Sequence, residues 1–262
     1  MEVERRTSFK VQRDVLYALL LREMGSRFGR TRASFLWVLV EPLAHLLVPM
    51  TIFGYVMQRS LPGVEYPVFL FYGFLPFLFF KTICLQTMEG TRANRGLLSY
   101  RQVLLMDVFI AKALSFCAIE AIVFLIVLVG LQMLAYDALP GRPLELLAVL
   151  ALTVMFAFGM GLLLAAVGSF APDAKNIVRV IFIPLYFLSG VLFPVTRFPD
   201  DWVQYLAINP VLHVVEMARV NAIAHYEPMR YLSAEYVIGL TIFSLFIGLA
   251  LYRLRYLQRV TM

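Results

Sequence analysis

Charged residues are scarce in this sequence. They make up 15% of its 262 residues, whereas a soluble domain contains about 25%. Several apolar runs exceed the ~18 residues that a helix needs to cross a hydrocarbon core of about 30 Å. The low charge content argues against an ordinary soluble domain, and the runs predict an all-α polytopic membrane protein.

Cysteines and catalytic motifs are also scarce. Both cysteines, Cys84 and Cys117, lie inside apolar runs, so we predict buried thiols without a disulfide framework or metal ligation. The sequence has no Gly-x-x-x-x-Gly-Lys-Ser/Thr phosphate loop, no Gly-x-Ser-x-Gly elbow and no His-Glu-x-x-His zinc helix. We therefore predict that this chain binds no metal or cofactor and that another protein powers it.

The net charge of +6 is the one compositional feature that suggests nucleic acid. Most of the basic residues flank apolar runs, which is the distribution that membrane topology produces. We therefore do not expect a nucleic-acid partner.

Six apolar runs are predicted to span the membrane. Five of them lie within residues 35–195 and the sixth is 232–252. The predicted spans are Phe35–Met57, Val68–Met88, Val108–Tyr136, Leu144–Phe170, Asn176–Val195 and Leu232–Tyr252.

Two further segments are predicted to be helical without spanning. Residues 1–34 contain an amphipathic helix, Thr7–Phe28, which would lie in the membrane interface with its basic side toward water. Residues 196–231 carry too many polar side chains for a lipid-facing span. We predict an outer, periplasmic re-entrant helical hairpin there, since neighbouring helices can satisfy its polar groups. Residues 253–262 form a basic tail.

The distribution of basic residues predicts the orientation. With six spans and an inside N-terminus, 17 of the 23 Lys and Arg residues fall on the inner side, five fall outside and Lys81 lies within a span. A seventh crossing through 196–231 would place the basic tail outside, against the positive-inside rule. We therefore expect a multi-pass protein of the cytoplasmic membrane with both termini in the cytoplasm.

Three stretches in register resemble ABC-2 type polysaccharide-export permeases. Arg22–Pro42 resembles the family's entry signature, with its basic residues, Leu-Trp and Glu-Pro. Asn94–Arg101, Asn-Arg-Gly-Leu-Leu-Ser-Tyr-Arg, resembles its cytoplasmic loop, and Asn209–Arg219, Asn-Pro-Val-Leu-His-Val-Val-Glu-Met-Ala-Arg, resembles its outer hairpin. Nearly the whole chain follows this order, and it is most similar to the inner-membrane permeases of Gram-negative capsular polysaccharide exporters.

The resemblance implies a set of partners. The permease would be a homodimer that binds two copies of a separate ATP-binding subunit, which holds ATP and Mg²⁺. The cargo would be an acidic polysaccharide with a lipid terminus, moved across the bacterial inner membrane. A periplasmic adaptor and an outer-membrane channel would complete the export route.

Two cytoplasmic groups are candidates for function. Segment 88–107 is the longest polar interruption on the inner side, and we predict that it docks in the ATP-binding subunit; the alternative is a solvated loop whose charges only set topology. Its anchors would be Glu89, Arg92, Asn94, Arg95, Tyr100 and Arg101. The second group would gate the entrance and attract an anionic head group, or only anchor the chain by the positive-inside rule. It comprises Arg22, Arg27, Arg30, Arg32 and Trp37.

Residues within the spans are candidates for a translocation path. Aromatic faces can hold a sliding sugar polymer, and the alternative for each ring is ordinary packing. Lys81 and Glu120 are the deepest ionisable groups, which are costly in a membrane unless they are paired or hydrated; they could pair with each other or face the path. The path candidates are Tyr55, Phe69, Tyr72, Lys81, Glu120, Tyr186 and Phe187.

The predicted outer hairpin carries Asn209, His213, Glu216 and Arg219. His213 and Glu216 lie one helical turn apart, but metal sites usually need three or more protein ligands. We therefore predict a contact between helices there.

Two other functions fit parts of the sequence. A permease of the same fold for O-antigen, teichoic acid or drugs would differ only in cargo. A polytopic glycosyl- or acyltransferase would need catalytic carboxylates or histidines that come together at a membrane face. The only candidates for such a site are His213, Glu216 and His225.

Overall fold

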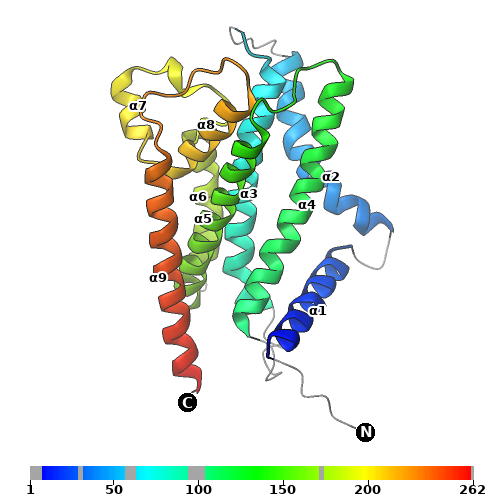
Figure 1. Cartoon of the computed structure of the whole chain (residues 1–262), viewed down its shortest axis with the longest axis vertical. Helices are drawn as coiled ribbons and strands as arrows, with labels where there is room; N and C mark the ends of the chain where they lie inside the picture. Colours follow the sequence, from blue (N-terminus) through cyan, green and yellow to red (C-terminus); the bar gives the residue numbers. More distant parts are fainter. Residues whose placement is uncertain (1–7, 29–31, 57–62, 94–103, 171–173, 261–262) are drawn as a thin grey trace.

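The computed structural model describes residues 8–28, 32–56, 63–93, 104–170 and 174–260. In these ranges the regular elements are helices, which form one elongated bundle (Figure 1). Their bounds are α1 Ser8–Phe28, α2 Arg32–Pro49, the π-helix η1 Met50–Val56, α3 Tyr66–Ala93, α4 Leu105–Met133, α5 Pro143–Phe170, α6 Ala174–Leu188, the short 3₁₀-helix η3 Val195–Arg197, α7 Asp200–Leu206, α8 Pro210–Ala222 and α9 Ala234–Val260. The predicted all-α class is confirmed.

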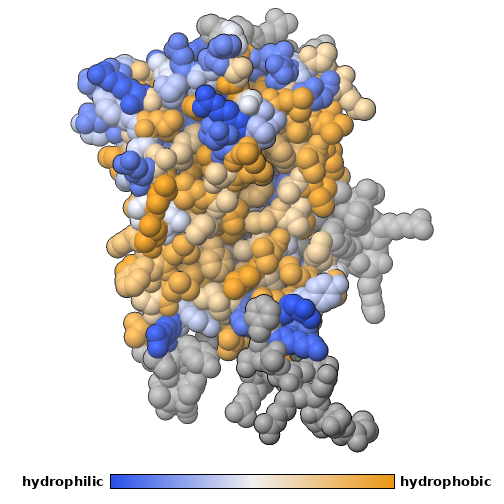
Figure 2. Space-filling model, viewed as in Figure 1, coloured by the Kyte–Doolittle hydropathy of each residue, from blue (hydrophilic) through white to orange (hydrophobic). Residues whose placement is uncertain are grey.

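Four of the described helices are long and apolar enough to cross a membrane. Their apolar parts are Tyr66–Gly90, Leu105–Met133, Pro143–Gly168 and Ala234–Leu254. At about 1.5 Å per residue, each exceeds the thickness of a hydrocarbon core. They correspond to the second, third, fourth and sixth predicted spans. Figure 2 shows the matching surface, with hydrophobic residues across the middle of the molecule and hydrophilic residues gathered at the upper end.

The first and fifth predicted spans have a different form. α2 carries Glu41 and His45 and passes directly into the π-helix η1. α6 has 15 residues and ends because Gly190, just beyond Leu188, has a φ of 63°. That backbone conformation suits glycine and stops a right-handed helix.

α3 is the centre of the bundle. α3 is apolar on all sides, and α4, α5 and α8 pack around it. Four consecutive residues are therefore fully buried: Phe69, Leu70, Phe71 and Tyr72. α5 approaches its neighbours at two glycines: a Cβ at Gly159 would lie 2.5 Å from Ser244 Oγ of α9, and one at Gly161 would lie 2.6 Å from Thr87 Cβ of α3. Small residues at these points allow the helices to pack closely.

The amphipathic N-terminal segment is helical and packs against α4. Leu19 of α1 is buried with Val108 and Ala111 of α4, and the two helices run side by side in Figure 1. One ion pair joins them, with Lys112 Nζ 3.5 Å from Glu23 Oε1. α1 is therefore attached to the bundle by a charged contact as well as an apolar one.

The described residues at both ends of segment 88–107 are largely helical. α3 continues through Ala93 and α4 begins at Leu105, so Glu89 and Arg92 belong to the last turns of a helix. Asn94, Arg95, Tyr100 and Arg101 lie outside the described residues. Asp107 caps the start of α4, because its carboxylate accepts the Leu104 N–H at 3.1 Å.

Candidate functional site

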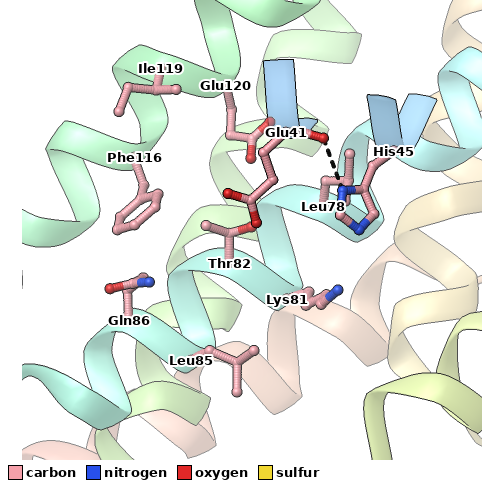
Figure 3. A pocket seen from close by; sticks show the side chains of 10 residues that line it. All are labelled: Glu41, His45, Leu78, Lys81, Thr82, Leu85, Gln86, Phe116, Ile119 and Glu120. Atoms are coloured by element: carbon pink, nitrogen blue, oxygen red, sulfur yellow. Dashed lines mark hydrogen bonds between the residues drawn. The ribbon is translucent and has the colours of Figure 1, made fainter. Parts of the chain in front are cut away.

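A polar pocket of about 270 Å³ lies among α2, α3 and α4. The pocket is unusual because polar side chains line it although its helices belong to an apolar bundle. In such a bundle, polar side chains are retained mainly for function or for pairing. The residues that line it are Glu41, His45, Leu78, Lys81, Thr82, Leu85, Gln86, Phe116, Ile119 and Glu120 (Figure 3).

A hydrogen bond to the backbone orients the ring of His45. Its Nδ1 lies 3.0 Å from the backbone carbonyl of Glu41, one turn earlier on α2. A carbonyl oxygen can only accept, so Nδ1 donates to it. α2 thus presents an imidazole ring and a carboxylate to the pocket.

Two carboxylates share the pocket. Glu120, on α4, is only 6% exposed, and Figure 3 shows its carboxylate and that of Glu41 extending into the same space. Glu120 is buried in α4, whereas Glu41 of α2 is exposed. The two carboxylates thus bring α2 and α4 together at one polar site.

Lys81 lines the same pocket but points away from both carboxylates in Figure 3. Among the described residues, no salt bridge joins Lys81 to Glu120. The structure thus brings the two deepest charges into one cavity without direct pairing.

The candidate aromatic residues occupy different environments. Phe69 and Tyr72 are fully buried, and the Tyr72 hydroxyl donates to the Ala138 carbonyl at 2.6 Å. Tyr186 is half-buried against Phe74 and Phe77 of α3, and its neighbour Phe187 is exposed. Tyr55 lies in η1.

The described entrance candidates belong to α1 and α2. Arg22 is exposed on α1, and Trp37 is 67% exposed on α2. Arg27 and Arg32 lie in the last turn of α1 and the first residue of α2, and Arg30 falls outside the described residues.

Arg219 forms a buried cluster at the end of the bundle opposite the start of α1 (Figure 1). Its guanidinium is fully buried and donates to four acceptors. Nε donates to the Phe69 carbonyl of α3 at 3.3 Å, and Nη1 donates to Glu216 Oε1 of α8 at 3.0 Å. Nη1 and Nη2 donate to the carbonyls of Gly190 and Val191, just after α6, at 2.9 and 2.8 Å. We call these residues, with Tyr226, the arginine cluster.

The charge of Glu216 is also compensated inside this cluster. The Tyr226 hydroxyl donates to both of its carboxylate oxygens at 3.1 Å. Burial, opposed in part by the Arg219 charge, raises the pKa of Tyr226 far above its usual range, so the hydroxyl stays protonated as a donor. A buried charge pair is tolerated when its remaining donors and acceptors are satisfied in this way.

His213 has a structural role in the same helix. Its Nε2 lies 2.7 Å from the Ala207 carbonyl, and the Ser233 N–H donates to its Nδ1 at 3.1 Å. Both ring nitrogens are thus satisfied in the neutral form, and burial lowers the pKa of His213. The predicted helix contact through His213 is present, joining α8 to the end of α7 and the start of α9.

Comparison with known proteins identifies the family. Residues 14–223 match the ABC-2 type transporter family. The chain belongs to this family.

The permease also has curated relatives that cover almost its full length. It is 37% identical over 250 residues to the polysialic acid transport protein KpsM of Escherichia coli, covering 95% of this chain and 96% of that protein. It is 27% identical to the capsule polysaccharide export inner-membrane protein CtrC of Neisseria meningitidis, over 93% and 91% of the two chains. The O-antigen export system permease protein RfbA of Myxococcus xanthus is 27% identical, over 86% and 88%.

Sequence reasoning missed several residues of this ABC-2 permease. Glu41 and His45 were not singled out for the pocket, although their spacing of four places them on one face of a helix. Arg179 was counted only as a topological charge, yet it pairs with Glu89 across two helices. Nothing in the local sequence indicated that Arg219 would reach α3 and the end of α6.

Proposed function

We propose that this chain is the transmembrane subunit of an ATP-driven exporter that moves lipid-linked capsular polysaccharide across the bacterial inner membrane. The observation that carries the proposal is full-length similarity to capsule-export permeases. The fold supports it, since long apolar helices surround polar groups that a purely structural bundle does not need.

The proposed membrane arrangement has six spans. α2 and η1 follow each other without a break over 18 and 7 residues, enough for a first crossing at about 1.5 Å per residue. α6 with the turn after it would form the fifth. α7 and α8 would form the re-entrant outer hairpin of residues 196–231, whose polar groups the arginine cluster satisfies inside the protein.

Both termini are proposed to be cytoplasmic. The start of α1 and the end of α9 lie at the same end of the bundle in Figure 1, and the distribution of basic residues supports a cytoplasmic position for that end. The same end carries Glu89 and Arg92, the first anchors of the segment proposed to dock on the ATP-binding subunit.

The full exporter is proposed to contain two copies of this permease and two ATP-binding subunits, which bind ATP and Mg²⁺. A periplasmic adaptor and an outer-membrane channel would receive the polymer. The entrance residues would attract its anionic lipid terminus. Neutralising Arg27, Arg30 and Arg32 should then reduce export without changing topology; a change in topology alone would assign them to anchoring.

The path residues are proposed to contact the polymer as it passes. Photocrosslinkers placed at Trp37, Tyr186 and Phe187 should label a trapped glycan, with the lipid-exposed Ile242 of α9 as the control position. Label at Ile242 alone would reject a path along these aromatic residues.

The function is tested in sealed inner-membrane vesicles that contain the permease and its ATP-binding subunit. Lipid-linked capsular glycan should become inaccessible to an added glycosidase only when ATP is hydrolysed, and a hydrolysis-deficient ATP-binding subunit should abolish this. Movement of O-antigen but not capsular glycan would favour the alternative cargo. Sugar or acyl transfer by the permease without the ATP-binding subunit would instead favour an enzyme.

A further inference from the structure

The pocket among α2, α3 and α4 receives polar side chains from all three helices. α2 contributes Glu41 and His45, and α3 contributes Thr82 and Gln86. Both pairs are spaced by four residues, which puts the members of each pair on one face of their helix. α4 adds Glu120, so the three helices turn polar groups toward the same space (Figure 3).

The charged groups of this pocket form two poles. The carboxylates of Glu41 and Glu120 extend into one part of the space, whereas Lys81 points away from both (Figure 3). In the described ranges of the chain, no salt bridge joins Lys81 to either carboxylate. Ionisable groups inside a membrane bundle are costly unless they are paired, hydrated or used. Because the poles do not neutralise each other directly, both are available to a ligand that enters between them.

Several polar atoms around the poles can also accept or donate further hydrogen bonds. Within the described part of the molecule, the Gln86 amide has no hydrogen-bond partner. His45 uses Nδ1 on the Glu41 carbonyl, which leaves its Nε2. The Thr82 hydroxyl is hydrogen-bonded to Glu120, but a carboxylate offers about four lone-pair sites. The pocket therefore retains both donors and acceptors for a polar ligand.

The size and the apolar part of the lining suit a single sugar ring. The volume of about 270 Å³ lies just below the range of about 300–1,000 Å³ for sites of drug-sized ligands. Phe116, Leu78 and Leu85 supply apolar surface beside the polar groups. A sugar has the matching character, since its C–H faces are apolar and its hydroxyls lie around the edge. The pocket thus accommodates one unit of a polymer and not a long stretch of it.

The two poles favour an acidic sugar over other ligands. Carboxylates accept hydroxyl donors in charge-assisted hydrogen bonds, and an ammonium group binds a carboxylate in the same way. A neutral sugar would leave Lys81 without a partner. A metal ion would also leave it without one, and the described residues contain no group of three or more His, Cys, Asp or Glu side chains that could hold a metal ion.

We propose that this pocket is a subsite for one acidic sugar unit of the exported polymer, with the hydroxyls of the sugar on Glu41 and Glu120 and its carboxylate on Lys81. The inference rests on the proposed function, which supplies the polymer. A unit bound here contacts three helices at once. The subsite selects cargo by the charge of its repeating unit, because only a unit with a carboxylate satisfies both poles.

The first test measures the binding of free sugars to the purified complex of the permease with its ATP-binding subunit, in the absence of ATP. The probes are methyl β-glucuronide and the methyl α-glycoside of N-acetylneuraminic acid, each compared with its own uncharged methyl ester. Titrations followed by saturation-transfer NMR should show at least one acid binding about tenfold more tightly than its ester. The reason is that only the acid can form an ion pair with Lys81.

Variants at the two poles should shift this preference in opposite directions. Lys81→Met should abolish the difference between acid and ester, whereas Lys81→Arg should keep most of it. Glu120→Gln should weaken binding of the ester but widen the preference for the acid, because it removes a strong hydroxyl acceptor and also a negative charge. The matched control is Arg230→Met, which removes an exposed cation that pairs with Asp200 and does not line the pocket. It should change neither affinity.

The second test asks whether the polymer uses this subsite. In sealed vesicles, the acid that binds should inhibit ATP-dependent export with an inhibition constant close to its dissociation constant. Its ester should inhibit about tenfold less well. In the Lys81→Arg vesicles, which retain a cation, the acid should still inhibit more strongly than the ester.

The outcomes separate the subsite from the proposed function. If wild-type vesicles export no glycan with ATP, the proposed function fails, whereas the binding measurements do not depend on export. Equal affinities for acid and ester, no binding of any probe, or an unchanged preference in Lys81→Met overturns the subsite. Binding with the expected preference but without inhibition of export also overturns it, since the polymer would then pass elsewhere.

Discussion

The guanidinium carbon of Arg219 lies 3.6 Å from the centre of the Phe69 ring, while the same side chain donates to the Phe69 carbonyl. A cation over an aromatic face is attracted by the ring quadrupole. The contact joins residues 150 positions apart in the sequence and attaches α8 to the central helix α3.

We expect Arg219→Met to destabilise the permease by about 3–5 kcal/mol, because it leaves Glu216 charged and buried without its partner. The double variant R219M/E216M should recover part of that loss, since both charges are removed. Unfolding of the purified permease in mixed micelles measures both values. A double variant less stable than the sum of the single variants would contradict the charge-pair account.

Gly73→Ala should destabilise the protein by about 1–3 kcal/mol through overpacking. A Cβ there would lie 2.2 Å from Arg219 Nη2 and 3.0 Å from the backbone carbonyl oxygen of Val191, so the guanidinium must move. The matched control is Gly130→Ala on α4, where no atom lies within 4 Å of the added Cβ. Equal thermal stability of the two variants would show that the guanidinium can relocate at little cost.

Acidification should loosen the outer hairpin through His213. Burial holds the pKa of His213 in the folded state below its ordinary value of about 6.5. At a pH between the folded and the unfolded pKa, the folded state therefore binds fewer protons than the unfolded state. The stabilising effect of neutral His213 is complete above the unfolded pKa and is lost as pH falls from the unfolded to the folded pKa. Amide exchange at Ser233, which donates to His213 Nδ1, should rise as pH falls, after correction for intrinsic exchange.

His213→Gln provides the comparison for this titration, because glutamine can bond the same two backbone groups without titrating. Its Ser233 protection should not depend on pH between about 5 and 7, around the usual histidine pKa. An equal pH dependence in wild type and H213Q would assign the effect to another group.

Lys81→Glu should reduce export strongly, because it places a third carboxylate in a pocket that already holds Glu41 and Glu120. Adding Glu120→Lys should restore much of the activity by restoring the net charge of the pocket. The measurement is ATP-dependent export at matched permease levels in the membrane. If the swap leaves export as low as Lys81→Glu does, the positions of these charges matter and not only their sum.

Reversing Arg92 and Arg95 to glutamate should uncouple ATP hydrolysis from export, because charged anchors of the proposed docking segment would be repelled. Arg92 lies in the last turn of α3, next to Glu89. ATP hydrolysis and polymer export are measured together, with co-purification of the ATP-binding subunit as the binding control. Wild-type export by the double variant would leave the segment a solvated loop that only sets topology.

The candidate site shows where sequence reasoning stopped. Lys81 and Glu120 could be singled out because a charge inside an apolar run is visible in the sequence, whatever its partners. The pocket that contains both could not be foreseen, because it depends on α2 bringing Glu41 and His45 against α3 and α4. Likewise, Glu216 and Arg219 are one turn apart on one helix, but the carbonyls that Arg219 binds belong to other elements.

The sequence by itself determined the class of the protein, four of its apolar spans and its resemblance to a family of export permeases. These follow from composition, run length and local motifs, since the membrane imposes its requirement on each segment separately. Only the tertiary structure decided that Glu89 pairs with Arg179, that Arg219 fastens α8 to α3 and α6, and that two carboxylates share one pocket. Those contacts join residues far apart in the chain, and packing alone brings such residues together.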